Sequence, residues 1–107
     1  MFTRVVEIRT KAGKARDFST ALNEKVLPIL RNQSGFIDEI TLVSTTEPER
    51  ILALSFWQSE TDADRYNRDQ FPNVTQIINP LVESTPKVQT FNVDTSTTHH
   101  IAKGKAA

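Results

Sequence analysis

Few side chains of this sequence could carry out acid–base or nucleophilic chemistry in the body of the chain. There is no cysteine, and the two histidines, His99 and His100, stand together near the end of the sequence. Thiol nucleophiles, disulfides and zinc knuckles are therefore excluded. We expect no metal centre. A general base in the body of the chain must be a carboxylate, or else the substrate must ionise unaided.

Glu7 is the carboxylate best placed for that role. It stands between Val6 and Ile8 in a segment whose residues alternate between apolar and polar. Burial among such neighbours would disfavour the charged form and make the carboxylate a stronger base. The structural alternative is an ion pair between Glu7 and either Arg9 or Arg50.

Two aromatic side chains that carry a polar group, Trp57 and Tyr66, form the second set of candidates. An indole N–H or a phenol O–H can donate a hydrogen bond to a ligand while the ring packs into an apolar wall. Either side chain could equally be an ordinary part of the core or of a helix face. Three phenylalanines could complete an aromatic-binding wall or simply fill the core: Phe18, Phe36 and Phe71.

Composition restricts the class of partner. The 107 residues include 13 basic and 13 acidic side chains, so the net charge is zero and a nucleic-acid surface is not expected. The longest apolar run, 51–57, is far shorter than the roughly 20 residues of a membrane helix. The first residues do not resemble a secretory signal. We therefore expect a cytoplasmic protein with no nucleic-acid or membrane partner.

Hydrophobic periodicity divides the chain into alternating strands and helices. We expect strands at 2–10, 36–45, 50–57 and 87–93, and helical segments at 14–30, 59–67 and 71–81. Residues from 95 onward are small and polar and show no period. The sequence therefore predicts one domain over residues 1–94 and a polar tail over 95–107, which contains both histidines.

Four residues mark where the helices bend, begin or end. Pro28 lies inside the first helical pattern, where it lacks a backbone donor and should interrupt the helix. Gly35 offers the left-handed conformation that commonly closes a helix. Ser59 and Asp62 resemble a capping box at the start of the second helical segment.

The order β-α-β-β-α-β predicts a ferredoxin-like α+β subunit, with a four-stranded antiparallel sheet and helices on one face. The other face then needs a cover that the chain itself does not supply. Four residues of the opposite parity are expected on that face: Val5, Ile37, Thr41 and Val43. A second copy of the sheet is the simplest cover, so we expect a homodimer.

Two runs resemble the antibiotic biosynthesis monooxygenase (ABM) domain family across residues 2–94. One is Ser55-Phe56-Trp57-Gln58-Ser59-Glu60, which leads to Tyr66; the other is Val26-Leu27-Pro28-Ile29-Leu30, followed by Gly35-Phe36. The resemblance implies a dimeric α/β barrel. It also implies an oxygenase that uses no metal, flavin or haem, and a phenol, quinol or anthrone as substrate. The resemblance also implies that Trp57 borders the cavity between the sheet and the helices.

Two departures from the family pattern keep alternatives open. Ala53 stands where polyketide-oxidising members typically place an asparagine, and Gln76 stands where haem-degrading relatives carry a histidine ligand. Haem degradation is therefore not expected. Two hypotheses remain: a cofactor-free monooxygenase that acts on a small aromatic, with Trp57, Tyr66 and Glu7 at its site, or a non-catalytic module that binds a small aromatic or only dimerises.

Overall fold

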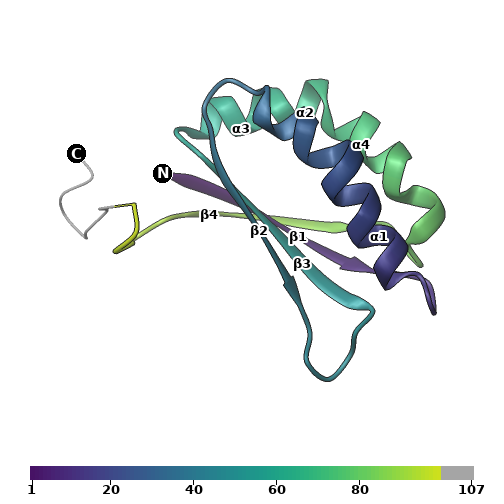
Figure 1. Ribbon diagram of the computed structural model, residues 1–107. Coiled ribbons are helices and arrows are strands. Elements are labelled where there is room, and N and C mark those ends of the chain that lie inside the picture. Colours follow the sequence, from purple (N-terminus) through teal and green to yellow (C-terminus); the bar gives the residue numbers. More distant parts are fainter. Residues whose placement is uncertain (100–107) are drawn as a thin grey trace.

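The computed structural model describes residues 1–99, which form a sheet with helices packed on one of its faces (Figure 1). The predicted order of strands and helices is confirmed. The elements are β1 Phe2–Arg9, α1 Ala15–Ala21, the π-helical turn η1 Leu22–Val26, α2 Leu27–Arg31, β2 Phe36–Val43, β3 Arg50–Trp57, α3 Glu60–Asp69, α4 Phe71–Ile78, the 3₁₀ turn η2 Asn79–Leu81 and β4 Lys87–Asn92.

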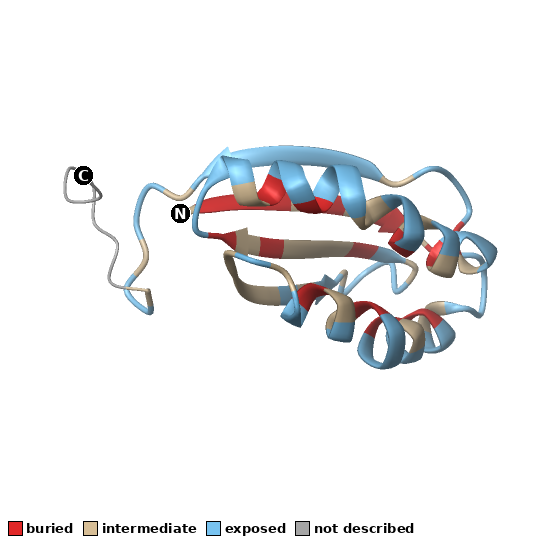
Figure 2. Cartoon of the chain, turned by 90° about the horizontal axis from the view of Figure 1, so that it is seen from above, coloured by how far each residue is buried: buried red, intermediate tan, exposed pale blue. Residues whose placement is uncertain are grey.

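The sheet has the strand order β2-β3-β1-β4, and every neighbouring pair is antiparallel. This is the ferredoxin-like α+β arrangement that the element order predicts. The two central strands, β1 and β3, pair along their whole length, from Phe2 opposite Trp57 to Arg9 opposite Arg50. Figure 2 shows β1 as buried along most of its length, whereas the edge strand β4 is exposed throughout.

Pro28 interrupts the first helical stretch, as predicted, and does so through a change of helix type. The backbone N–H of Leu27 donates to the carbonyl of Leu22, five residues earlier, so the chain widens into a π-helical turn between α1 and α2. A proline lacks the N–H of a normal turn and clashes with the carbonyl four residues before it. The wider turn relieves that clash, and the chain continues directly into α2.

The start of α3 is fixed by the capping contacts that the sequence predicts. The Ser59 hydroxyl accepts from the backbone N–H of Asp62 at 3.2 Å and donates to the Asp62 carboxylate at 2.9 Å. Gly35 has a φ of +79°, and a Cβ there would overlap the Asp62 side chain. Glycine is therefore required both by the backbone conformation and by the close approach of α3.

A β-bulge near the start of β2 makes one part of the predicted pattern wrong. The register of β2 against β3 shifts between Phe36 and Asp38, so the residues after the bulge change sides. Thr41 and Val43, which we expected on the open face, lie on the same side as the helices. Ile40 and Leu42 take their place on the open face, which they share with Val5 of β1 on the far side of β3.

The face of the sheet away from the helices carries exposed apolar side chains, which we call the open face. The most exposed of them are Ile40 (42%), Leu42 (46%) and Phe91 (51%). The less exposed Val5, Leu52, Leu54 and Phe56 belong to the same face by strand parity. Among residues 1–99 no helix is long and apolar enough to cross a membrane.

Beyond β4, His99 lies at one end of the open face. Its imidazole is 3.9 Å from the Asp38 carboxylate, and its ring centroid is 6.3 Å from that of Phe56. Thus the predicted tail contacts the sheet at this residue. His100 lies outside the described residues.

Candidate active site

A cavity lies between the sheet and the helices, with its floor on β1, β2 and β3 and its roof on α1, η1, α2, α3 and α4. The side chains around it are mostly aliphatic or aromatic. The centres of water molecules could occupy about 40 Å³ of it. The polar side chains that line it are Arg4, Glu39, Ser55 and Tyr66.

Three of these polar side chains form a row across the floor. In the sheet register, Ser55 on β3 lies opposite Arg4 on β1 and also opposite Glu39 on β2. Residues directly opposite one another in a sheet project to the same face. We call these three residues the polar row. A cation and a carboxylate therefore flank a small hydroxyl on the floor of an otherwise apolar cavity.

Arg4 is buried, with 3% of its surface exposed, and is held by aromatic rings. Its guanidinium carbon lies 4.5 Å from the ring centroid of Phe71 and 5.2 Å from that of Tyr66. Its Nη2 donates to Asn67 Oδ1 at 2.9 Å. No carboxylate of the described chain comes within ion-pair distance of it. Burial lowers the pKa of Arg4, an effect that neighbouring Tyr66 and the more distant charge of Asp64 oppose. An arginine nevertheless remains charged in proteins.

Tyr66 lies beside Arg4 and is also buried. Burial raises the pKa of its phenol to about 12, although the Arg4 guanidinium works in the opposite direction. The phenol is therefore neutral near pH 7 and can donate its proton in a hydrogen bond. Tyr66 stacks on Trp57, with ring centroids 5.0 Å apart.

Trp57 lies behind Tyr66 and does not line the cavity, contrary to what the resemblance implies. It is 0% exposed, and its indole N–H donates to Ser55 Oγ at 2.9 Å. Phe36 packs edge-on against it, with ring centroids 5.6 Å apart, and does not line the cavity either. Both residues therefore support the wall, whereas Phe18 and Phe71 line the cavity.

Glu39 reaches the cavity from β2, and burial raises the pKa of its carboxyl group. The Thr41 hydroxyl donates to its Oε2 at 2.8 Å and partly offsets that effect, while the charge of Asp38 adds to it. A carboxylate in such surroundings holds a proton more readily than an exposed one. It is the carboxylate that the structure places near Tyr66.

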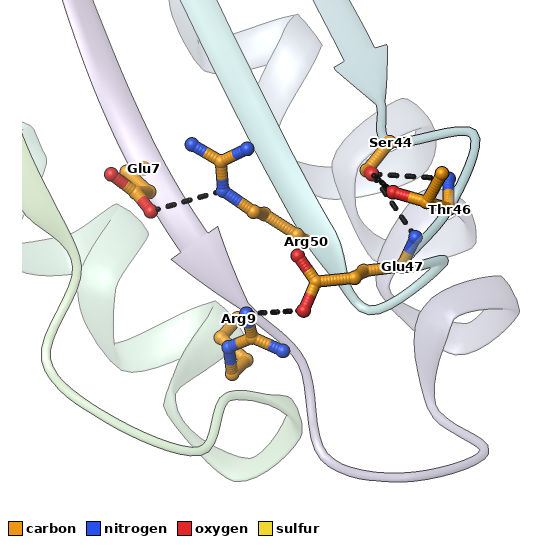
Figure 3. A network of polar contacts seen from close by, with 6 residues as sticks. All are labelled: Glu7, Arg9, Ser44, Thr46, Glu47 and Arg50. Atoms are coloured by element: carbon orange, nitrogen blue, oxygen red, sulfur yellow. Dashed lines mark hydrogen bonds and ion pairs between the residues drawn. The ribbon is translucent and has the colours of Figure 1, made fainter.

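Glu7 lies on the open face, separated from Tyr66 by the sheet. Its side chain is 44% exposed, and its Oε2 is 3.3 Å from Arg50 Nε. Figure 3 shows this pair beside a second one, in which Arg9 contacts Glu47. The structural alternative, an ion pair with Arg50, is thus the arrangement observed, and Glu7 does not share the cavity with the other candidates.

Sequence reasoning missed three functional candidates: Arg4, Ser55 and Asn67. The signal for Arg4 was available, because it alternates in phase with the buried residues Phe2 and Val6. A charged residue on an apolar strand face is unusual, because charged side chains are seldom buried without a partner, and it therefore indicates a functional role. Within residues 1–99, no group of three or more histidine, aspartate or glutamate side chains could hold a metal ion.

Comparisons with known proteins agree with this fold. SnoaB, a cofactor-independent oxygenase from Streptomyces nogalater, superposes with a TM-score of 0.76 at 14% identity, over 90% of this chain and 95% of that one. A protein from Shewanella oneidensis gives a TM-score of 0.70 at 25% identity, over 84% of this chain and 87% of that one. A conserved protein from Methanosarcina mazei superposes with a TM-score of 0.71 at 20% identity, over 86% of this chain and 92% of that one.

In sequence, no curated protein matches the chain. The family model described as antibiotic biosynthesis monooxygenase matches residues 1–70, which include β1, β2, β3 and α3 and therefore the whole polar row and Tyr66. The chain belongs to the antibiotic biosynthesis monooxygenase family.

Proposed function

We propose that this protein is a cofactor-independent monooxygenase that acts on a small phenol, quinol or anthrone-like aromatic. The observation that carries the proposal is the buried guanidinium of Arg4, which has no carboxylate partner in the described chain and projects into an apolar cavity beside Tyr66. A buried, unpaired charge is costly unless a ligand neutralises it. An aromatic oxyanion suits both the charge and the surrounding rings.

The proposed chemistry requires little from the protein beyond binding the anion. Loss of the substrate's hydroxyl proton leaves an electron-rich anion, which passes one electron to dioxygen. Superoxide and the aryl radical then combine at a ring carbon that bears hydrogen. Loss of water from the resulting hydroperoxide gives the carbonyl product, so one oxygen atom enters the product and the other leaves as water. Arg4 and Tyr66 would stabilise the anion, and the apolar walls would limit bulk water.

The size of the cavity favours a small substrate. An engineered cavity that binds benzene measures about 150 Å³, whereas this cavity offers about 40 Å³. A substrate ring must therefore displace lining side chains, and each added ring must displace more of them. We accordingly expect one- and two-ring substrates to react faster than three-ring substrates.

We also propose a homodimer that forms through the open face. Exposed, contiguous apolar surface of this kind commonly marks an interface between proteins. An isologous contact would cover Ile40, Leu42 and Phe91 together, and two such sheets would form a dimeric α/β barrel. Sedimentation tests this proposal: a mass near 24 kDa, twice 12.1 kDa, is expected, and a mass near 12.1 kDa would contradict it. A cytoplasmic location remains a prediction from the sequence.

A non-catalytic module that binds a small aromatic is the second candidate. Ala53 favours it, because this residue lines the cavity and cannot hydrogen-bond a substrate carbonyl through its side chain. Such a module would use the same cavity and the same anion-binding guanidinium. It would bind a phenol without accelerating the consumption of oxygen, and this difference separates the two functions.

Oxygen uptake tests the proposed function directly. Wild-type protein is mixed with menadiol or anthrone, and the uncatalysed rate is subtracted. We expect catalysed uptake that falls about tenfold in Tyr66→Phe, because one hydrogen bond to the anion is lost. Arg68→Met is the control, since Arg68 is exposed and pairs with Asp69 away from the cavity. Uptake that never exceeds the uncatalysed rate, combined with tight binding of a phenol, would favour the binding module instead.

A further inference from the structure

We propose that Glu39 is the general base of this site, and that it removes the substrate's hydroxyl proton while Arg4 holds the resulting oxyanion. The inference rests on the proposed function and deepens it by assigning the proton-transfer step to a residue. The substrate must then carry an acidic hydroxyl, as phenols, quinols and the enol form of anthrones do.

The polar row supplies the geometry for this step. Neighbouring strands of a sheet lie about 4.8 Å apart, so the backbones at Glu39 and Arg4 are about 10 Å apart, with Ser55 between them. Both side chains are long and line the same cavity, whereas Ser55 is short. A hydroxyl oxygen placed above Ser55 is therefore within reach of the carboxylate from one side and of the guanidinium from the other.

The surroundings of Glu39 suit a base. Thr41 donates to Oε2, which leaves Oε1 as the oxygen available to a substrate. Two titratable groups interact with the carboxyl group: the charge of Asp38, on its own strand, raises the pKa of Glu39, and the charge of Glu39 raises the pKa of Tyr66 on α3. Arg4 lines the same cavity as Glu39, and Arg31 of α2 lines a second hollow with it. Burial raises the pKa of Glu39 toward the range in which a carboxylate is an effective proton acceptor.

The charges balance through the step. The substrate O–H bond breaks, the proton goes to Glu39 Oε1, and the electron pair stays on the substrate oxygen. One negative charge therefore moves from Glu39 to the phenolate, closer to Arg4, and the net charge in the cavity does not change. The peroxide anion that forms next takes this proton from Glu39 and becomes the hydroperoxide, so Glu39 is again a carboxylate. When the hydroperoxide loses water, the C–H and O–O bonds break, and the carboxylate passes the C–H proton to the departing hydroxide.

Four proteins test the assignment through the pH dependence of oxygen uptake: wild type, Glu39→Gln, Glu39→Asp and Asp38→Asn. Asp38 is the matched control because it neighbours Glu39 in sequence but faces the other side of the sheet. In wild type, kcat/KM should rise with pH as Glu39 loses its proton. In Glu39→Gln this rise of kcat/KM with pH should disappear, and kcat should fall about 100-fold with little change in KM. Glu39→Asp should keep this rise at a reduced rate. Asp38→Asn should keep the wild-type kcat but show the rise at lower pH, because the negative charge that helps to raise the pKa of Glu39 is removed.

A second measurement, made without oxygen, separates this inference from the proposed function. Under anaerobic conditions 4-nitrophenol is added below its own pKa, and the visible absorbance of its anion is recorded. Wild type and Asp38→Asn should increase the anion band on binding, and Glu39→Gln should bind the phenol without increasing it. If this pattern is found but wild type consumes no oxygen, the proposed function fails and the base assignment stands.

Three outcomes would overturn the assignment. The first is a Glu39→Gln variant that retains the wild-type kcat and the same acid limb. The second is an anion band that increases equally in wild type and in Glu39→Gln. The third is a wild-type protein that consumes oxygen but does not bind 4-nitrophenol, because the polar row would then not recognise a phenol.

Discussion

The arginines on the two faces of the sheet differ in burial and in their partners. On the helix-covered face, Arg4 is 3% exposed, is held between aromatic rings and has no carboxylate partner in the described chain. On the open face, Arg9 and Arg50 are exposed and each contacts a glutamate at 3.3 Å. Exposed pairs of that kind contribute little to stability. The comparison shows that burial without a partner distinguishes the candidate functional charge from the structural ones.

The largest expected effect concerns the ring that supports the cavity wall. Trp57→Ala should lower the free energy of unfolding by about 3–5 kcal/mol, because a fully buried ring is replaced by a void. The same truncation on the open face, Phe91→Ala, should change it by less than about 0.5 kcal/mol in dilute, monomeric protein. Urea unfolding measures both values. Equal losses of unfolding free energy in the two variants would contradict the difference in packing between the covered face and the open face.

Replacing an arginine on each face should separate activity from stability. Arg4→Met should lower kcat/KM about 100-fold, the magnitude seen when one oxyanion donor is removed. Its free energy of unfolding should stay the same or rise by about 1 kcal/mol, since a buried unpaired charge is lost. Arg50→Met should leave oxygen uptake unchanged. An Arg4→Met protein that unfolds readily and loses activity only for that reason would contradict the comparison.

Alkaline pH should weaken the covered face through Tyr66. The pKa of its phenol is raised from 10.0 to about 12, so the unfolded chain loses this proton before the folded chain does. The corresponding stabilisation, about 2–3 kcal/mol, is fully present below pH 10 and is lost as the pH rises toward 12. Tyr66→Phe should remove this part of the alkaline loss. Unfolding curves of both proteins at pH 9 and above provide the measurement.

The smallest effect is expected for the residue that first suggested a base. Glu7→Gln breaks an exposed pair with Arg50 and should cost less than about 1 kcal/mol. Oxygen uptake should keep both its rate and its pH dependence. A large loss of kcat in this variant, with the dimer intact, would bring Glu7 back as a catalytic candidate and would count against Glu39.

Much of the fold was predictable because each strand and helix shows its own period and its own end signals. Pro28 and the Ser59 cap acted as local chemistry requires. The bulge between Phe36 and Asp38 was not predictable, because no local residue type demands it, and it reversed the expected sides of every later residue in β2. Without the bulge Glu39 would lie on the open face, whereas with it Glu39 lies on the helix-covered side, opposite Ser55.

The candidate site was predicted less well than the fold, for a different reason. Glu7 and Arg4 lie on the same strand but on opposite faces, and alternation alone does not say which face the helices cover when both carry apolar residues. Trp57 satisfies its own indole N–H two residues away, on Ser55, so its polar edge carried no information about a ligand. The charged residue on the more apolar side, Arg4, was the better indicator.

The π-helical turn has a consequence for the roof of the cavity. Four apolar residues follow one another at intervals of four: Phe18, Leu22, Val26 and Leu30. On a regular α-helix each such step advances about 40° beyond a full turn, so the stripe would spiral by about 120° from first to last. The wider turn at Leu22–Val26 absorbs part of that angular drift, and all four side chains line the same cavity. The interval of four is thus matched to a helix that is locally unwound.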